Sequence, residues 1–127
     1  MHDAYKLHYE KMTDISILHY RTVEGRFPYR EWVESIADKT ARAAVLARVD
    51  RLAFGSFGDW KAIGDGVFEL RVHLGAGHRV YFGRDGKTVV ILLCGGEKRS
   101  QDADIRRAKR YWKDYEARKN PAGGRSR

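Results

Sequence analysis

Side chains able to bind a phosphate or move a proton recur at every second position in two neighbouring stretches of the sequence. They are Glu69, Arg71 and His73 in the first stretch, and Arg79 and Tyr81 in the second. In an extended chain successive side chains point to opposite faces, so residues two positions apart share a face. The apolar residues between them predict the core-facing side: Phe68, Leu70, Val72, Val80 and Phe82. The polar side chains are therefore expected on one surface.

That surface carries the kinds of group needed to cleave RNA through its own 2′-hydroxyl. The reaction needs a base near the hydroxyl, cations on the phosphorane oxygens and a proton donor for the leaving 5′-oxygen, and it needs no metal. Glu69 or His73 could be the base. Tyr81 or His78 could donate the proton or provide an aromatic platform for a nucleobase.

Three basic residues are the predicted phosphate-binding cations of this set: Arg71, Arg79 and Lys98. Guanidinium groups suit the task because they hold a phosphate through two nitrogens. The spacing alone does not assign the individual roles. The alternative is an ordinary solvent-facing sheet surface, on which Glu69 and Arg71 form a weak cross-strand pair.

Other classes of site have less support. Cys94 follows an apolar run and is interpreted as a small core residue, and as a lone cysteine it excludes an internal disulfide. There is no GxxxxGK[ST] loop, no metal-binding HExxH pair and no cysteine cluster, so neither a metal nor a cofactor is expected. The five histidines are His2, His8, His19, His73 and His78. No stretch resembles a membrane span or a signal peptide, and we predict a cytoplasmic protein.

The charge of the chain is concentrated near its C-terminus. Lys and Arg number 25 against 17 Asp and Glu, a net charge of +8, and residues 96–127 contain 11 basic and 5 acidic groups, or +6 of that total. Such asymmetry suits a polyanion, either nucleic acid or an acidic partner protein. A well-solvated helix face and tail would explain the same composition.

The elements that must position these groups follow from the apolar periods. Residues 15–20 alternate as a strand, 28–36 and 38–52 have helical spacing, 68–73 and 79–82 alternate again, and 89–93 are apolar on both faces. A last helix begins after Ser100 and has a narrow apolar stripe amid basic residues. We therefore predict an α+β domain over residues 14–119: an antiparallel sheet packed on one side by an N-terminal helical hairpin and a C-terminal helix, leaving its other face free to bind.

The two ends of the sequence are treated separately. Residues 1–13 are predicted to be an N-terminal extension, and the functional start could be Met1 or Met12. Residues 120–127 are predicted to be a disordered basic tail.

Several stretches resemble the HigB-like addiction-module killer proteins of the RelE/ParE toxin superfamily. They are residues 60–72 (WKAIGDGVFELRV), 77–82 (GHRVYF), 92–98 (LLCGGEK) and Ala108-Lys109, and the match runs from about Asp14 to about Tyr115. The resemblance implies the β-α-α-β-β-β-α fold of that superfamily. It also implies a type II toxin that inhibits translation by cutting mRNA, commonly on the ribosome, and a helix-turn-helix (HigA-like) antitoxin as its partner.

Family members of this kind use basic residues on the sheet and after its last strand, and the matching positions here are Arg71, Arg79, Lys98 and Arg99. Two positions depart from RelE: Glu69 stands where RelE has a catalytic lysine, and no tyrosine occurs near Ile105, early in the last helix. The predicted catalytic set is Glu69, Arg71, Arg79, Tyr81 and Lys98. The predicted RNA-binding set is Lys61, His73, His78, Arg99, Arg106, Lys109 and Arg110.

Two other functions stay open at the level of sequence. A ParE-like toxin would inhibit DNA gyrase without being an enzyme, and a phage-derived accessory domain would not be toxic. The cluster of Arg71, Arg79 and Lys98 beside Glu69 and Tyr81 favours the nuclease, because a gyrase-binding protein does not need a phosphate cradle. For the antitoxin we predict contacts near Arg106, Arg110 and Lys113, across the last helix or the helical hairpin. Ribosomal RNA, or solvent alone, is the alternative partner of these residues.

Overall fold

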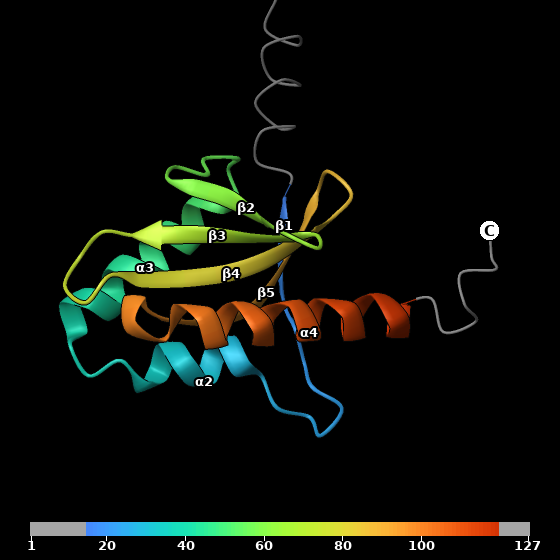
Figure 1. Cartoon of the computed structure of the whole chain (residues 1–127). Helices are drawn as coiled ribbons and strands as arrows, with labels where there is room; N and C mark the ends of the chain where they lie inside the picture. The colour runs from blue at the N-terminus through green and yellow to red at the C-terminus, as the bar shows by residue number, and fades with distance from the viewer. Residues whose placement is uncertain (1–14, 120–127) are drawn as a thin grey trace, which may run out of the picture.

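A single five-stranded sheet organises the protein (Figure 1). The structure, a computed structural model, describes residues 15–119. The strands lie in the order β1-β5-β4-β3-β2, with β1 parallel to β5 and every other pair antiparallel. Their bounds are β1 (Ser16–His19), β2 (Trp60–Gly64), β3 (Val67–Val72), β4 (His78–Asp85) and β5 (Val89–Glu97). The predicted α+β class is confirmed, and the sheet is mixed at its β1 edge.

Strand β2 was not predicted, because its residues lack a clear apolar alternation. It forms the other edge of the sheet and pairs with β3 through a two-residue turn, Asp65-Gly66, whose residues have φ values of 56° and 84°. Aspartate followed by glycine is the preferred pair for a turn that needs two positive φ angles. Strand β5 also extends beyond the prediction, since Gly95 and Gly96 lie inside it and do not end it.

The helices begin and end close to where their sequence signals place them. They are α2 (Pro28–Ser35), α3 (Lys39–Leu52) and α4 (Gln101–Lys119), the last preceded by a short 3₁₀ turn, η1 (Lys98–Ser100). Asp38 caps α3, with its carboxylate accepting hydrogen bonds from the amides of Thr40 (3.0 Å) and Ala41 (3.4 Å). Such a cap satisfies amides that would otherwise lack partners at a helix start.

Helices cover both faces of the sheet, which corrects the expectation that all three would lie on one side. On one face α2 and α3 pack against Leu70, Val80, Phe82 and their neighbours. On the other face α4 packs through Ala108 and Trp112. The sheet residues beneath α4 are Val67, Tyr81, Ile91, Leu93 and Cys94. Because β5 is apolar on both faces, as its sequence indicated, each face has to be covered.

Glycines on the inner strands allow the helices to approach the sheet closely. Trp32 of α2 lies on Gly95, and Trp112 of α4 lies on Gly83, so that a Cβ atom at either glycine would overlap the indole ring. Asp104 of α4 lies in the same way against Gly96. The two helical layers are thus held to opposite faces of β4 and β5.

Within the described range, no helix has the length and apolar character needed to cross a membrane. The predicted N-terminal extension, residues 1–13, and the predicted tail, residues 120–127, lie outside the described residues.

Candidate functional site

The carboxylate of Glu69 lies at the centre of a buried polar network between the sheet and the start of α4. Its side chain has no exposed surface. One oxygen, Oε2, accepts hydrogen bonds from the Tyr81 hydroxyl (3.0 Å) and the Gln101 amide (2.7 Å). The other, Oε1, accepts one from Nε of Arg71 (3.2 Å), and Nε of Arg79 lies 3.5 Å from Oε2. Four side chains from β3, β4 and α4 therefore converge on one anion.

These contacts keep Glu69 ionised. Burial acts to raise the pKa of its carboxyl, but hydrogen bonds from Gln101, Tyr81 and Arg71 and the charge of Arg79 outweigh burial and hold the pKa below its usual range. Burial and the negative charge of Glu69 raise the pKa of Tyr81. Neither side chain reaches the surface, so these buried positions do not favour the predicted roles of base for Glu69 and proton donor for Tyr81.

The stability of the fold should depend on pH through Glu69. Its folded pKa lies below the unfolded value of about 4.3, so its charge stabilises the fold above that pH, and this contribution is lost as the pH falls through the folded pKa. Glu69→Gln should lower the melting temperature at neutral pH. Between about pH 6 and pH 3 the melting temperature of this variant should then fall by less than that of the parent protein.

Circular dichroism during heating at several pH values measures this difference. Glu34→Gln, at an exposed position of α2, is the matched control and should follow the parent. If Glu69→Gln followed the parent as well, the buried carboxylate would not be the stabilising anion described here.

Three cations lie around this network at the end of the sheet, and we call them the cationic site: Arg71, Arg79 and Lys98. The Arg71 side chain is 32% exposed and that of Arg79 is 12% exposed. Nη1 of Arg79 donates a hydrogen bond to the carbonyl of Gly77 (2.9 Å), and a Cβ atom at Gly77 would lie 3.5 Å from both Arg79 and Lys98. Lys98 itself is exposed. The pairing of Arg71 with Arg79 across β3 and β4 brings the two guanidinium groups together.

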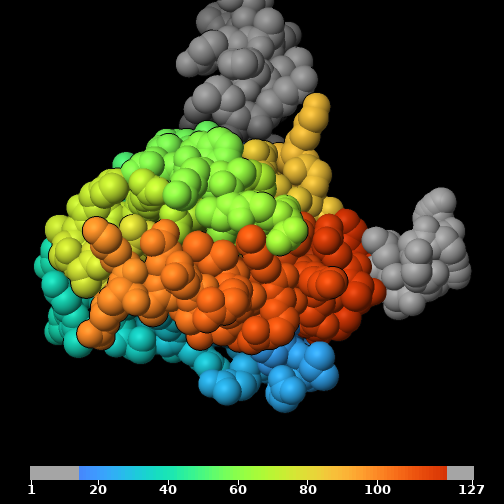
Figure 2. Space-filling model, viewed as in Figure 1, coloured from blue at the N-terminus to red at the C-terminus, as the bar shows by residue number. Residues whose placement is uncertain are grey.

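Figure 2 shows this region where the start of α4, in orange, meets the β3–β4 connection, in yellow-green. The alternation predicted for β3 and β4 is confirmed, because Glu69 pairs with Tyr81 and Arg71 with Arg79 in the register. Sequence reasoning missed Gln101, whose role depends on α4 crossing the second face. It also missed Asp59, which precedes the unpredicted β2 and contacts the imidazole of His73.

The predicted RNA-binding residues are spread over a wider area. Lys61 is exposed on β2, opposite Glu69. Nζ of Lys109 lies 3.4 Å from Oδ2 of Asp65, and Nε of Arg99 lies 3.2 Å from Oε1 of Glu97. The remaining residues of this set that are exposed are His73, Arg106 and Arg110.

His78 is the exception in this set. It is 4% exposed and lies against Trp32, with 6.1 Å between ring centroids, on the face that α2 and α3 cover. The prediction that it would take part in RNA binding or proton donation does not agree with this position. His78 begins β4, one residue before Arg79, and alternation directs it to the opposite face.

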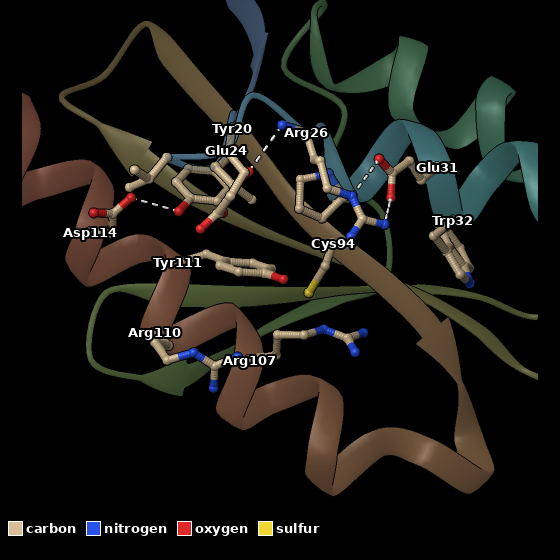
Figure 3. Close-up of a pocket in the computed structure, with 13 residues that line it drawn as sticks. Tyr20, Glu24, Arg26, Glu31, Trp32, Cys94, Arg107, Arg110, Tyr111 and Asp114 are labelled. Atoms are coloured by element: carbon tan, nitrogen blue, oxygen red, sulfur yellow. Dashed lines mark hydrogen bonds and ion pairs between the residues drawn. The ribbon is translucent and has the colours of Figure 1, made fainter.

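A cavity of about 720 Å³ lies on the other flank of α4, between that helix and the segment that joins β1 to α2. Figure 3 shows Arg107, Arg110 and Tyr111 of α4 on one side of it and Tyr20 and Trp32 among the residues on the other. Cys94 lines it but is 1% exposed, and burial raises the pKa of its thiol to about 12. An unreactive thiol agrees with the prediction of a core cysteine.

A mixed sheet between a helix pair and a C-terminal helix, with basic residues gathered at one end, defines a small α+β protein of RelE-like fold. Residues 32–113 match the family model for "Phage derived protein Gp49-like (DUF891)", and the chain belongs to this family, which is a RelE-like toxin family. An uncharacterized protein of Haemophilus influenzae (strain Rd) is 47% identical over 87 residues, covering 68% of this chain and 88% of the relative. The family is associated with the toxins of toxin–antitoxin systems, which in general have an antitoxin partner.

Proposed function

We propose that this protein is the toxin of a type II toxin–antitoxin pair, of the HigB-like kind, and that it inhibits translation as a metal-independent endoribonuclease acting on mRNA in the cytoplasm. The observation that carries the proposal is the cationic site. Arg71 and Arg79 lie against the buried, ionised Glu69 on the side of the sheet where α4 begins, and Lys98, directly after β5, lies with Arg79 around Gly77.

Such an arrangement suits a phosphate whose charge increases in the transition state. Cations held in place before the reaction stabilise that charge without having to reorganise. Arg71 is held by a hydrogen bond from its Nε to Glu69 and Arg79 by one from its Nη1 to the Gly77 carbonyl, with its Nε 3.5 Å from the Glu69 carboxylate. Lys98 is a point charge at the surface. The resemblance to ribosome-dependent toxins supports translated mRNA as the substrate.

The proposal predicts that induced expression stops protein synthesis before DNA replication. Incorporation of labelled amino acid and labelled thymidine after induction measures the order of the two effects, and primer extension on mRNA locates the cuts. The purified protein should cut mRNA in a reconstituted translation system or as free RNA, and the cleavage of free RNA should persist in excess EDTA. A gyrase-dependent DNA-damage response with intact mRNA and normal translation would contradict the proposal and favour the ParE-like alternative.

We propose, further, that a co-encoded helix-turn-helix antitoxin binds along α4. Arg106, Arg110 and Lys113 are exposed there and form no ion pair with any residue in the range 15–119. Arg110 also lines the cavity of Figure 3 and lies over the ring of Tyr111, 5.7 Å from its centroid. Tyrosine, tryptophan and arginine, which recur in the lining of this cavity, are the side chains that most often dominate protein interfaces.

Reversing the three charges (Arg106→Glu, Arg110→Glu and Lys113→Glu together) should weaken antitoxin binding, with a smaller difference from the parent at high salt, because exposed charges are screened. Titration calorimetry at two salt concentrations measures the effect. Reversal of Lys39 and Arg51 on α3 and of Lys87 in the turn between β4 and β5, all exposed, is the matched control and should bind the antitoxin as the parent does. A loss of binding in this control alone would place the antitoxin on the helical hairpin. If the triple α4 variant bound the antitoxin normally but no longer associated with ribosomes, α4 would be an RNA-binding surface.

A further inference from the structure

One exposed imidazole, that of His73, follows Arg71 of the cationic site by two residues. Glu69 is buried and already accepts three hydrogen bonds. His78 is buried against Trp32, and His19 lies edge-on to Tyr29, 5.5 Å between ring centroids, on the face of the helix pair. His73, by contrast, has a side chain that is 71% exposed. Of the histidines within residues 15–119, it alone is open to a substrate and close in sequence to the cations.

The position of His73 is fixed by Asp59. Nε2 of His73 contacts Oδ2 of the Asp59 carboxylate. Asp59 directly precedes β2, and its carbonyl accepts a hydrogen bond from the amide of Arg71 (2.9 Å), so the register of β2 on β3 sets where this carboxylate lies. A partner on one ring nitrogen fixes the tautomer and the orientation of a histidine. When Nε2 donates to the Asp59 carboxylate, Nδ1 is the ring nitrogen that can accept a proton from a substrate.

The charged groups around the pair agree with an ionised Asp59. The hydrogen bond from His73 is the main cause that lowers the pKa of Asp59, and the charges of Arg71 on β3 and Arg48 on α3 add to it. Arg48 is itself held by a hydrogen bond to the carbonyl of Phe57 (3.1 Å). The carboxylate that contacts the imidazole is therefore also influenced by the guanidinium group of Arg71, which belongs to the cationic site.

We infer that His73 is the general base of the proposed RNA cleavage and that Asp59 is its positioning residue. Nδ1 of His73 takes the proton of the 2′-hydroxyl as the 2′-oxygen forms a bond to phosphorus. The bond from phosphorus to the 5′-oxygen breaks, and that oxygen takes a proton from water. The products are a 2′,3′-cyclic phosphate and a 5′-hydroxyl end, and the imidazolium returns its proton to solvent. This inference rests on the proposed function.

The test compares three variants with the parent chain on free RNA and on mRNA in a purified translation system. His73→Gly should lower the cleavage rate by about 10²- to 10⁴-fold, the usual contribution of a general base, while binding of RNA with a 2′-deoxy substitution at the cut site stays unchanged. Added imidazole should restore part of the activity, since the site is exposed.

Asp59→Asn should lower kcat and leave KM unchanged, because the tautomer is no longer fixed. Leu74→Ala, at the exposed neighbouring position, is the control and should behave as the parent.

The outcomes separate a failure of the His73 inference from a failure of the proposed nuclease function. If His73→Gly cleaved as fast as the parent while Arg79→Ala was inactive, the base would lie elsewhere and the nuclease proposal would stand. Loss of activity together with loss of binding to the 2′-deoxy RNA, and no rescue by imidazole, would make His73 a binding residue and overturn the inference. A parent chain that cut RNA in neither system would overturn both proposals.

Discussion

Arg79→Ala is expected to abolish toxicity and mRNA cleavage. Nη1 of Arg79 donates a hydrogen bond to the Gly77 carbonyl, and its Nε lies 3.5 Å from the Glu69 carboxylate. The guanidinium group is therefore oriented before a phosphate binds. Loss of one oriented donor to a transition-state anion costs about 2.7–4 kcal/mol, or a 10²- to 10³-fold lower rate. Colony survival after induction and the initial rate of mRNA cleavage measure the two effects.

The substitution also removes a partner of a buried anion, because the Arg79 side chain is 12% exposed. The loss of activity therefore needs a fold control. Thermal unfolding of Arg79→Ala and Arg79→Lys provides it, since lysine keeps the charge but not the two-nitrogen geometry. Arg51→Ala, at an exposed position of α3, should kill as the parent does. A folded Arg79→Ala protein that killed equally well would exclude Arg79 from the site.

Phe82→Ala should lower the free energy of unfolding by about 3–5 kcal/mol, as expected for an emptied aromatic site in a core. Phe82 has no exposed surface, stacks on Phe68 with 5.5 Å between ring centroids and lies 6.0 Å from Phe57. Urea unfolding followed by tryptophan fluorescence measures the change. Phe54→Ala, at a position 55% exposed, should change the same quantity by less than about 0.5 kcal/mol. Equal effects of the two substitutions would mean that Phe82 does not face the core.

The common face of Glu69, Arg71, Arg79 and Tyr81 could be predicted because alternation is a local property of an extended chain. The burial of Glu69 and Tyr81 could not, since it depends on which face α4 covers, and a narrow apolar stripe on a helix does not say where that helix docks. For this reason we propose another role for Glu69: a carboxylate covered by Gln101 and α4 orients the cations.

The contact between Asp59 and His73 could not be predicted from the sequence, because it too depends on tertiary structure. The two residues are brought together by β2, a strand with one apolar side chain that is half-buried, Ile63, and a register shift between Ala62 and Gly64. Edge strands of this kind carry little periodic signal. The parallel direction of β1 relative to β5 could not be predicted either, because alternation along a strand is the same in parallel and antiparallel pairs.

Gly95 and Gly96 make β5 the thinnest layer between the helices on the two faces of the sheet. Trp32 rests on one side of this dipeptide and Asp104 on the other, so at this point only the backbone of β5 separates α2 from the first turns of α4. Elsewhere in a core, side chains can change rotamer and take up a small movement, but a glycine has none to change. At this point the distance between α2 and the end of α4 that bears Gln101 is therefore set by the thickness of one backbone strand.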